Sequence, residues 1–116
     1  MTLRIKIDGP FTGSYSLAIV NREMAMALEE LNPGSVALCF DSSADWKPEN
    51  DQEYLQNHPQ VDQLYRRSLR ADTPDVVLYN SYPPIVSRVA GALALTNSYG
   101  WEETFFPVRH LLLRLF

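Results

Sequence analysis

Residues 3–14 read LRIKIDGPFTGS and predict a strand that runs directly into a turn. Residues 3–7 alternate apolar and charged side chains, which is the period of an extended strand. Residues 8–14 are rich in glycine, proline and small polar residues, which favour turns. From Ser16 to Leu31 apolar residues recur at helical spacing, so a helix is expected after the turn.

Three further strands are predicted by short apolar runs. Residues 36–40 are continuously apolar, which is typical of a strand buried on both faces of a parallel sheet. Residues 75–79 form the next strand candidate, and the paired prolines at 83–84 end it because they cannot continue a ladder of hydrogen bonds. Residues 92–97 are the fourth candidate, and the polar residues 41–51 predict a loop.

Helical segments are expected between these strands. Residues 32–34 are Asn-Pro-Gly and end the first helix, since glycine follows helix ends and proline cannot continue them. Residues 51–70 predict one or two short helices, interrupted near His58 and Pro59. Short helical stretches are also predicted at 85–89 and 107–116. We expect Ser14 or Ser16 to cap the first helix with its hydroxyl group.

The alternation of strands and helices predicts an α/β fold: a Rossmann-like parallel sheet with helices on both faces, in a single domain over residues 1–116. In the doubly wound pattern the first strand lies centrally, and the turn Gly9–Ser14 lies near the point where the strand order reverses. Ligands of such sheets, often nucleotides or sugars, bind at the carboxyl ends of the strands. Backbone N–H groups at the start of the following helix lack internal partners and can hold an anion.

Composition excludes several classes of function. The chain has 116 residues and a formal net charge of −4, and no basic stripe suggests binding to nucleic acid. Arg66, Arg67 and Arg70 share one helical segment with flanking acids, so we interpret them as a solvated helix face. No apolar run reaches the ~20 residues of a membrane span, and the first residues do not resemble a signal peptide. A cytoplasmic location is therefore predicted.

Cysteine and histidine usage predicts no metal centre and no cofactor. Cys39 is the only cysteine and lies in an apolar run, so we expect a buried thiol that is neither a nucleophile nor part of an intramolecular disulfide. His58 and His110 have no cysteine or histidine at ligand spacing. Asp8, at the end of the first strand, is expected to accept a hydrogen bond from the backbone of its own turn.

Three stretches carry a family resemblance. The first is DGPF at 8–11 with GSYSLA at 13–18 and NRE at 21–23. The second is YNSYPP at 79–84, and the third is YGWEET at 99–104, which leads to a proline at 107. In this order and spacing they resemble the start of bacterial GT-B glycosyltransferases of the large retaining, family 4-like group, which use nucleotide-sugar donors. The resemblance covers essentially the whole chain, but only the first part of such an enzyme.

The resemblance implies the incomplete N-terminal, acceptor-side domain of a hexosyltransferase. Family members carry the nucleotide-sugar site and its paired glutamates mainly in a second domain, so no catalytic residue is expected here and the isolated chain is expected to be inactive. The partners implied for the full-length enzyme are a nucleotide sugar and a sugar acceptor. The resemblance implies substrate-binding roles for Gly9, Phe11, Gly13, Ser14, Tyr15, Trp101, Glu102 and Glu103.

Structural interpretations of the same residues stay open. The glycines of the first turn can serve backbone conformation alone, and Trp101 can be a core side chain. Glu102 and Glu103 can simply favour the positive end of a following helix. The alternative function is a stand-alone Rossmann-like binding or interaction module without catalysis. In either case the apolar terminus at 111–116 predicts a homo-oligomer.

Overall fold

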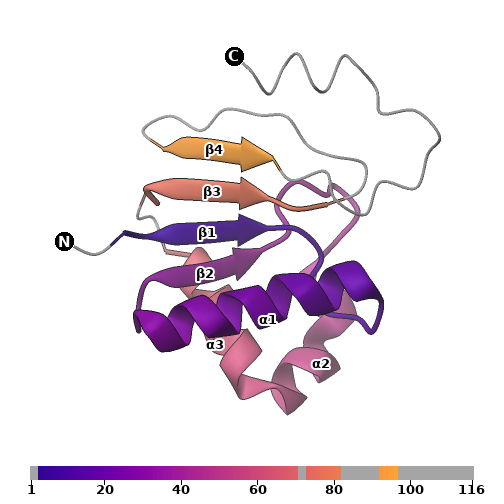
Figure 1. Ribbon diagram of the computed structural model, residues 1–116. Coiled ribbons are helices and arrows are strands. Elements are labelled where there is room, and N and C mark those ends of the chain that lie inside the picture. The colour runs from indigo at the N-terminus through magenta and orange to yellow at the C-terminus, as the bar shows by residue number, and fades with distance from the viewer. Residues whose placement is uncertain (1–2, 71–72, 82–91, 97–116) are drawn as a thin grey trace.

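A computed structural model describes residues 3–70, 73–81 and 92–96 of the chain. Its centre is one sheet of four parallel strands in the order β2-β1-β3-β4 (Figure 1). Each observed strand lies within the predicted run or is shifted from it by one or two residues. The strands are β1 (Ile5–Asp8), β2 (Val36–Cys39), β3 (Val76–Tyr79) and β4 (Leu93–Thr96).

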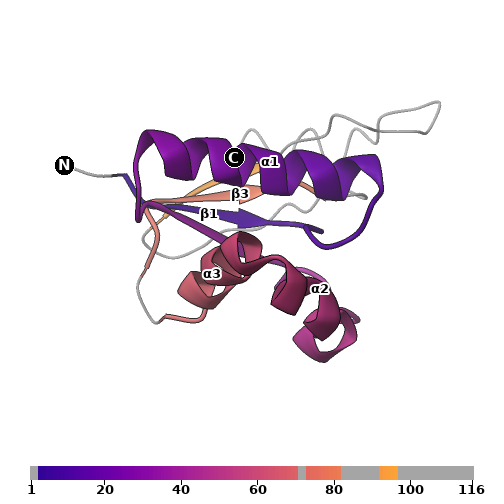
Figure 2. The ribbon, with the colours of Figure 1, turned by 90° about the horizontal axis from the view of Figure 1, so that it is seen from below.

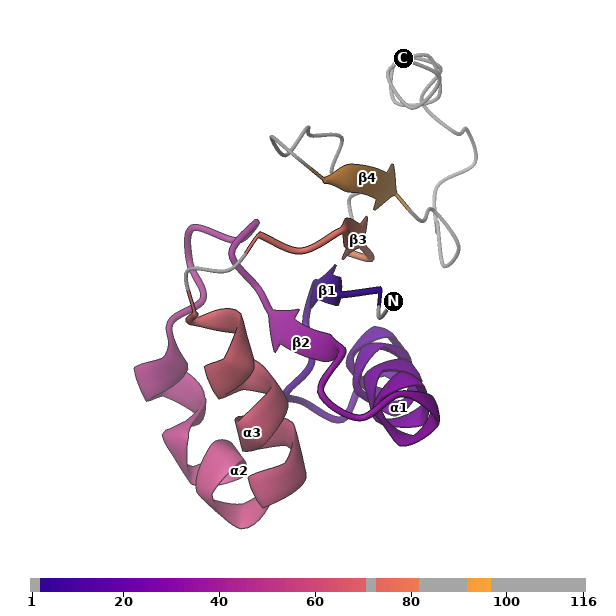
Figure 3. The ribbon, with the colours of Figure 1, turned by 90° about the vertical axis from the view of Figure 1, so that its left-hand side faces the viewer.

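The helices cover both faces of the sheet, which confirms the predicted α/β class. The 16-residue helix α1 (Ser16–Leu31) lies on one face (Figure 2). The other face carries α2 (Gln52–Asn57) and α3 (Pro59–Ser68), preceded by the 3-10 helix η1 (Pro48–Asp51) (Figure 3). Strand β1 lies between β2 and β3, as in doubly wound folds of strand order 2-1-3-4, so the strand order reverses beside β1.

The core is built from alternate residues of the strands and from the helices packed on them. Ile7, Val36 and Leu38 are fully buried and lie in one cluster with residues of α1 and α3. Val36 and Leu38 are two residues apart on β2, and Ile7 of β1 is the register partner of Leu38, so the three side chains lie on one face of the sheet. An aromatic group of Phe11, Trp46 and Tyr65 extends this core beneath the β1–α1 connection, with ring centroids 5.5–5.9 Å apart.

The C-terminal end of α1 agrees with the prediction from the sequence, but its N-terminal end does not. Helix α1 ends at Leu31, as the Asn-Pro-Gly sequence predicts, and Gly34 has a φ of +90° that favours glycine. The predicted serine cap is wrong: the N-cap residue is Tyr15, and no side chain caps the helix. Ser14 precedes the capping position and Ser16 is already helical, so neither has the place from which a hydroxyl caps a helix.

The region 51–70 forms two helices with a break at His58, and Pro59 opens α3, as predicted. The interpretation of its arginines as one solvated face is wrong for Arg67. That side chain is only 16% exposed and forms an ion pair with Glu29 of α1, whereas Arg66 is exposed and pairs with Asp62 on its own helix. The difference follows from which side of α3 faces the sheet.

Several predictions fall outside the described residues. The predicted helical stretches at 85–89 and 107–116 lie there, as does the segment that contains Trp101, Glu102 and Glu103. Among the helices within the described ranges, none is long and apolar enough to cross a membrane.

Candidate functional site

The carboxyl ends of the strands bring four polar side chains into one row. The strand register places Asp8 of β1 opposite Cys39 of β2 and Tyr79 of β3, and Tyr79 opposite Thr96 of β4. Register partners in a sheet share a face, so these side chains lie on the same side. The loop that joins β1 to α1, residues 9–15, begins at this edge of the sheet. We call this edge with its loop the carboxyl-edge site.

Buried hydrogen bonds fix the base of the loop. Asn21 of α1 donates from Nδ2 to the carbonyl oxygens of Pro10 at 2.7 Å and Asn80 at 3.0 Å. Asn80 donates in return to Asn21 Oδ1 at 2.6 Å. Gly9 is needed for this close packing, because a Cβ atom there would overlap the Asn80 carbonyl oxygen. The loop, α1 and the end of β3 are therefore held as one unit.

The middle of the loop is anchored to η1. Asp51 Oδ2 accepts hydrogen bonds from Thr12 Oγ1 at 2.5 Å and from Trp46 Nε1 at 2.6 Å. Phe11 is buried between Trp46 and Tyr65, so its ring belongs to the core. These contacts leave only the end of the loop free to meet a ligand.

The end of the loop, Gly13–Tyr15, is exposed beside the first turn of α1. Arg22 donates to the carbonyl oxygens of Phe11 and Gly13, which turns those carbonyl groups toward α1. Within the described part of the chain, no hydrogen bond uses the backbone N–H groups of residues 13–15. Gly13 has a φ of +147°, and a Cβ atom there would lie 2.9 Å from the Tyr15 ring. The segment thus presents unused donors at the positive end of a helix.

Charged side chains lie next to this loop. Lys6 Nζ forms an ion pair with Asp41 Oδ2 at 3.0 Å, just beyond the end of β2. Burial lowers the pKa of Lys6, but the neighbouring Cys39, Asp41 and Asp8 outweigh it and the net pKa is raised. The ammonium group therefore stays charged among its acidic neighbours.

Asp8 is buried, and its carboxylate faces the loop after β2. Asp8 Oδ1 accepts hydrogen bonds from the backbone N–H of Ser42 at 3.2 Å and from its hydroxyl at 2.7 Å. The prediction that Asp8 bonds to its own turn is therefore wrong, because the parallel pairing of β1 and β2 brings Ser42 closer. Burial raises the pKa of Asp8, although the hydrogen bonds from Ser42 act in the opposite direction.

Cys39 is buried as predicted, and the structure adds two carboxylates beside it. Burial, followed by the charge of Asp8, raises the pKa of its thiol, so the neutral form persists at neutral pH. One donor atom each from Asp8, Cys39 and Asp41 lie within 4.8 Å of one another, a grouping that could take a metal ion. The Lys6 ammonium already supplies positive charge there. Sequence reasoning missed this grouping because the pairing of β1 with β2 is what brings Asp8 beside Cys39 and Asp41.

The sequence-predicted site residues therefore divide into three groups. Gly9 and Phe11 are buried and support the loop from within. Gly13, Ser14 and Tyr15 are exposed together at its end. Trp101, Glu102 and Glu103 lie outside the described residues. Sequence reasoning also missed the contacts of Asn21, Arg22 and Asn80. Their amide and guanidinium groups are hydrogen-bond donors, but the sequence does not indicate which carbonyl groups accept from them.

The fold and this site define a small α/β protein with a doubly wound parallel sheet and an exposed glycine-serine loop at its carboxyl edge. Comparison of the chain with protein-family models, with curated proteins and with solved structures found no match.

Proposed function

We propose that the chain is the N-terminal, acceptor-side portion of a nucleotide-sugar-dependent glycosyltransferase. The observation that carries the proposal is the exposed segment Gly13–Tyr15 at the carboxyl end of the central strand β1. This is where doubly wound sheets bind their ligands. The family resemblance of the same residues supports the choice of a nucleotide sugar.

The diphosphate of the donor fits the end of the loop. Backbone N–H groups of residues 13–15 and the start of α1 offer hydrogen bonds and partial positive charge to an anion. The half-buried Arg22 adds a full positive charge behind the loop while it holds the Gly13 carbonyl away from the ligand. Ser14 and Ser16 are exposed there and supply hydroxyl groups.

The sugar acceptor fits the neighbouring charged side chains. Asp41 is 67% exposed, and its carboxylate can accept hydrogen bonds from sugar hydroxyl groups while Lys6 holds it in place. Stabilisation of the departing nucleotide diphosphate requires further positive groups. We assign those to the second domain that the resemblance implies, so the isolated chain binds nucleotide without transferring sugar.

Calorimetric titration of the purified chain tests the donor site. We expect saturable binding of UDP or GDP, and of UDP-glucose or GDP-mannose, with no sugar transfer above a buffer blank. Gly13→Ala should abolish the binding, because residues other than glycine rarely adopt the φ of +147° that the observed path of the loop requires. Gly34→Ala is the matched control, since Gly34 also has a positive φ but lies at the opposite end of the sheet, with open space around the new Cβ.

Three results would contradict the proposal. If no binding is detected at millimolar nucleotide concentrations, the loop does not recognise the nucleotide-sugar donor. Equal loss of binding in Gly13→Ala and Gly34→Ala means that the loss in Gly13→Ala is not specific to the carboxyl edge, which contradicts the proposed site. Measurable turnover by the isolated chain overturns the assignment of catalysis to a second domain.

We also propose that the chain self-associates through apolar surface near its C-terminal part. Strand β4 is one of the two edge strands of the described sheet, and Leu93 and Leu95 on it are 59% and 45% exposed. Sedimentation at micromolar concentration should show a dimer or larger species, and Leu95→Lys should shift it toward monomer. A wild-type monomer contradicts this proposal.

A further inference from the structure

A pocket lies at the opposite end of the sheet from the carboxyl-edge site, where the strands begin. It has a volume of about 100 Å³ and is bounded by the start of β1, the start of β2 and the C-terminal end of α3. We call it the amino-edge pocket. Its lining includes Arg4, Lys6, Gly34, Arg67 and Arg70.

The charge of this lining differs from that of the whole chain. The protein has 14 acidic and 10 basic residues, yet the described residues that line the pocket include four basic residues and no acidic residue. Two of the four basic side chains already form ion pairs: Lys6 pairs with Asp41, and Arg67 pairs with Glu29. The positive charge of Arg4 and Arg70 is therefore the part that a ligand can use.

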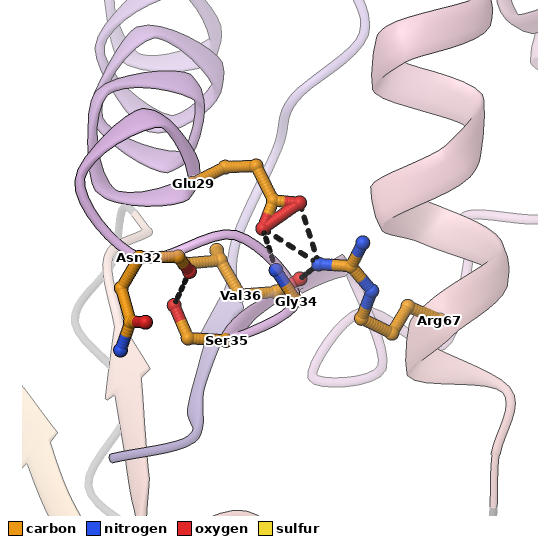
Figure 4. A network of polar contacts seen from close by, with 6 residues as sticks. All are labelled: Glu29, Asn32, Gly34, Ser35, Val36 and Arg67. Atoms are coloured by element: carbon orange, nitrogen blue, oxygen red, sulfur yellow. Dashed lines mark hydrogen bonds and ion pairs between the residues drawn. The ribbon is translucent and has the colours of Figure 1, made fainter. Parts of the chain in front are cut away.

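Hydrogen bonds hold the Arg67 side chain in one position in the lining of the pocket. Its Nη1 donates to Glu29 Oε1 at 2.9 Å, to Glu29 Oε2 at 2.8 Å and to the Val36 carbonyl oxygen at 2.7 Å (Figure 4). Glu29 is held in turn by the backbone N–H of Gly34, at 2.7 Å from Oε1. Within the described residues, Nη1 makes every side-chain hydrogen bond of Arg67, and Nη2 of Arg67 points away from these partners in Figure 4. Arg67 thus keeps further donors in a preset position.

Arg4 and Arg70 are the exposed basic residues of the lining. Both are exposed, and within the described ranges neither guanidinium group forms a hydrogen bond or an ion pair. The contacts of these residues come from the backbone: Arg4 N–H donates to Asp75 Oδ2 at 2.8 Å, and Arg70 N–H donates to the Arg67 carbonyl oxygen. The Asp75 carboxylate is therefore engaged by the backbone of Arg4 and not by its guanidinium group.

The size of the pocket selects among anions. Sites that enclose drug-sized ligands have volumes of roughly 300–1,000 Å³, so a whole nucleotide sugar does not fit here. A single tetrahedral oxyanion does fit, and the planar guanidinium group matches two of its oxygen atoms with two parallel hydrogen bonds. We propose that the amino-edge pocket binds one phosphate group, held by Arg4 and Arg70 against the fixed Arg67. The phosphate is either a free ion or the terminal group of a phosphate ester whose remainder extends into solvent.

Amide chemical shifts of the isotope-labelled chain test this site during titration with inorganic phosphate at constant ionic strength. We expect saturable shifts at Gly34 and Arg70 with a Kd of about 1 mM, and we expect the same shifts in the Gly13→Ala variant. The double variant Arg4→Gln with Arg70→Gln should weaken the binding by about tenfold or more, since each lost charge-assisted bond removes much of so small an interface. Arg66→Gln is the matched control, because Arg66 is on the same helix, is exposed and does not line the pocket.

Chemical shifts that do not saturate, or an equal loss of affinity in Arg66→Gln, overturn the proposal. Methyl phosphate and UMP distinguish the two sources. Equal affinity for inorganic phosphate and the esters supports a free ion, whereas tighter binding of an ester supports an organic phosphate. The Arg4→Gln, Arg70→Gln chain should bind UDP unchanged at the carboxyl edge, and Gly13→Ala should bind inorganic phosphate unchanged. The two sites can therefore fail independently.

Discussion

The two ends of the parallel sheet differ in how their charges are satisfied. At the carboxyl edge, the charged side chains of Lys6 and Asp41 neutralise each other, and the exposed end of the loop offers neutral backbone donors. At the amino edge, Arg67 is neutralised by Glu29, while the guanidinium groups of Arg4 and Arg70 have no acidic partner within the described part of the chain. A net charge of −4 therefore conceals one positive pocket, and composition alone does not reveal where a protein can bind an anion.

The largest effect is expected from the buried amide pair at the carboxyl edge. Asn21→Ala removes the donor to two carbonyl oxygens and the acceptor for Asn80, all of them away from solvent. Leaving buried polar groups without partners should lower the free energy of unfolding by about 3 kcal/mol. Urea denaturation measures this, with Asn57→Ala as the control because Asn57 is exposed. If both variants lose the same stability, the asparagine pair is not what holds the loop.

A smaller effect is expected at the amino edge, where one ion pair joins two helices. A double-mutant cycle of Glu29→Ala and Arg67→Ala should give a coupling free energy of about 2 kcal/mol, since both side chains are largely buried and the guanidinium group also binds a carbonyl oxygen. The same cycle on Asp62 and Arg66 should give a smaller, salt-sensitive coupling, because Arg66 is exposed. Equal coupling free energies in the two cycles would mean that Arg67 is held no more firmly than Arg66, which contradicts its role as the fixed basic group of the amino-edge pocket.

Much of the fold could be predicted because its signals are local. The alternation in residues 3–7, the apolar run at 36–40 and the Asn-Pro-Gly end of α1 depend on neighbours within a few residues. Pro59 marks the break between α2 and α3 in the same way, since proline opens a helix readily but does not continue one. These patterns predict each element without knowledge of its tertiary contacts.

The rest of the molecule depends on contacts between distant residues. Asn21 and Asn80 are 59 positions apart, and Glu29 and Arg67 are 38 apart. The bond between Asp8 and Ser42 spans 34 positions and exists because β1 and β2 pair in parallel. No spacing along the chain indicates such partners, so sequence reasoning placed Asp8 on its own turn and Arg67 in solvent. Both errors arise from strand register and helix orientation, which only the assembled sheet defines.

The smallest expected effect is a pH dependence at the carboxyl edge. Burial raises the pKa of Asp8 above its ordinary value of 3.8, so between that value and the raised pKa the folded chain binds more protons than the unfolded chain. Stability should therefore fall as pH rises through this window, by about 1.4 kcal/mol for each pH unit that separates the folded and unfolded pKa values. Asp8→Asn keeps an oxygen that accepts from Ser42 but cannot titrate, so its unfolding free energy should lack this slope.

The measurement is the difference in unfolding free energy between wild type and Asp8→Asn, from urea denaturation at a series of pH values beginning below 3.8. The difference should change in favour of Asp8→Asn as pH rises, and then level off above the raised pKa. A difference that is independent of pH means that the Ser42 bonds offset burial fully. The cost of burying the Asp8 carboxylate would then be fully offset by its hydrogen bonds, as the charge of Arg67 is offset by Glu29. The contrast between the two ends of the sheet would in that case depend only on Arg4 and Arg70.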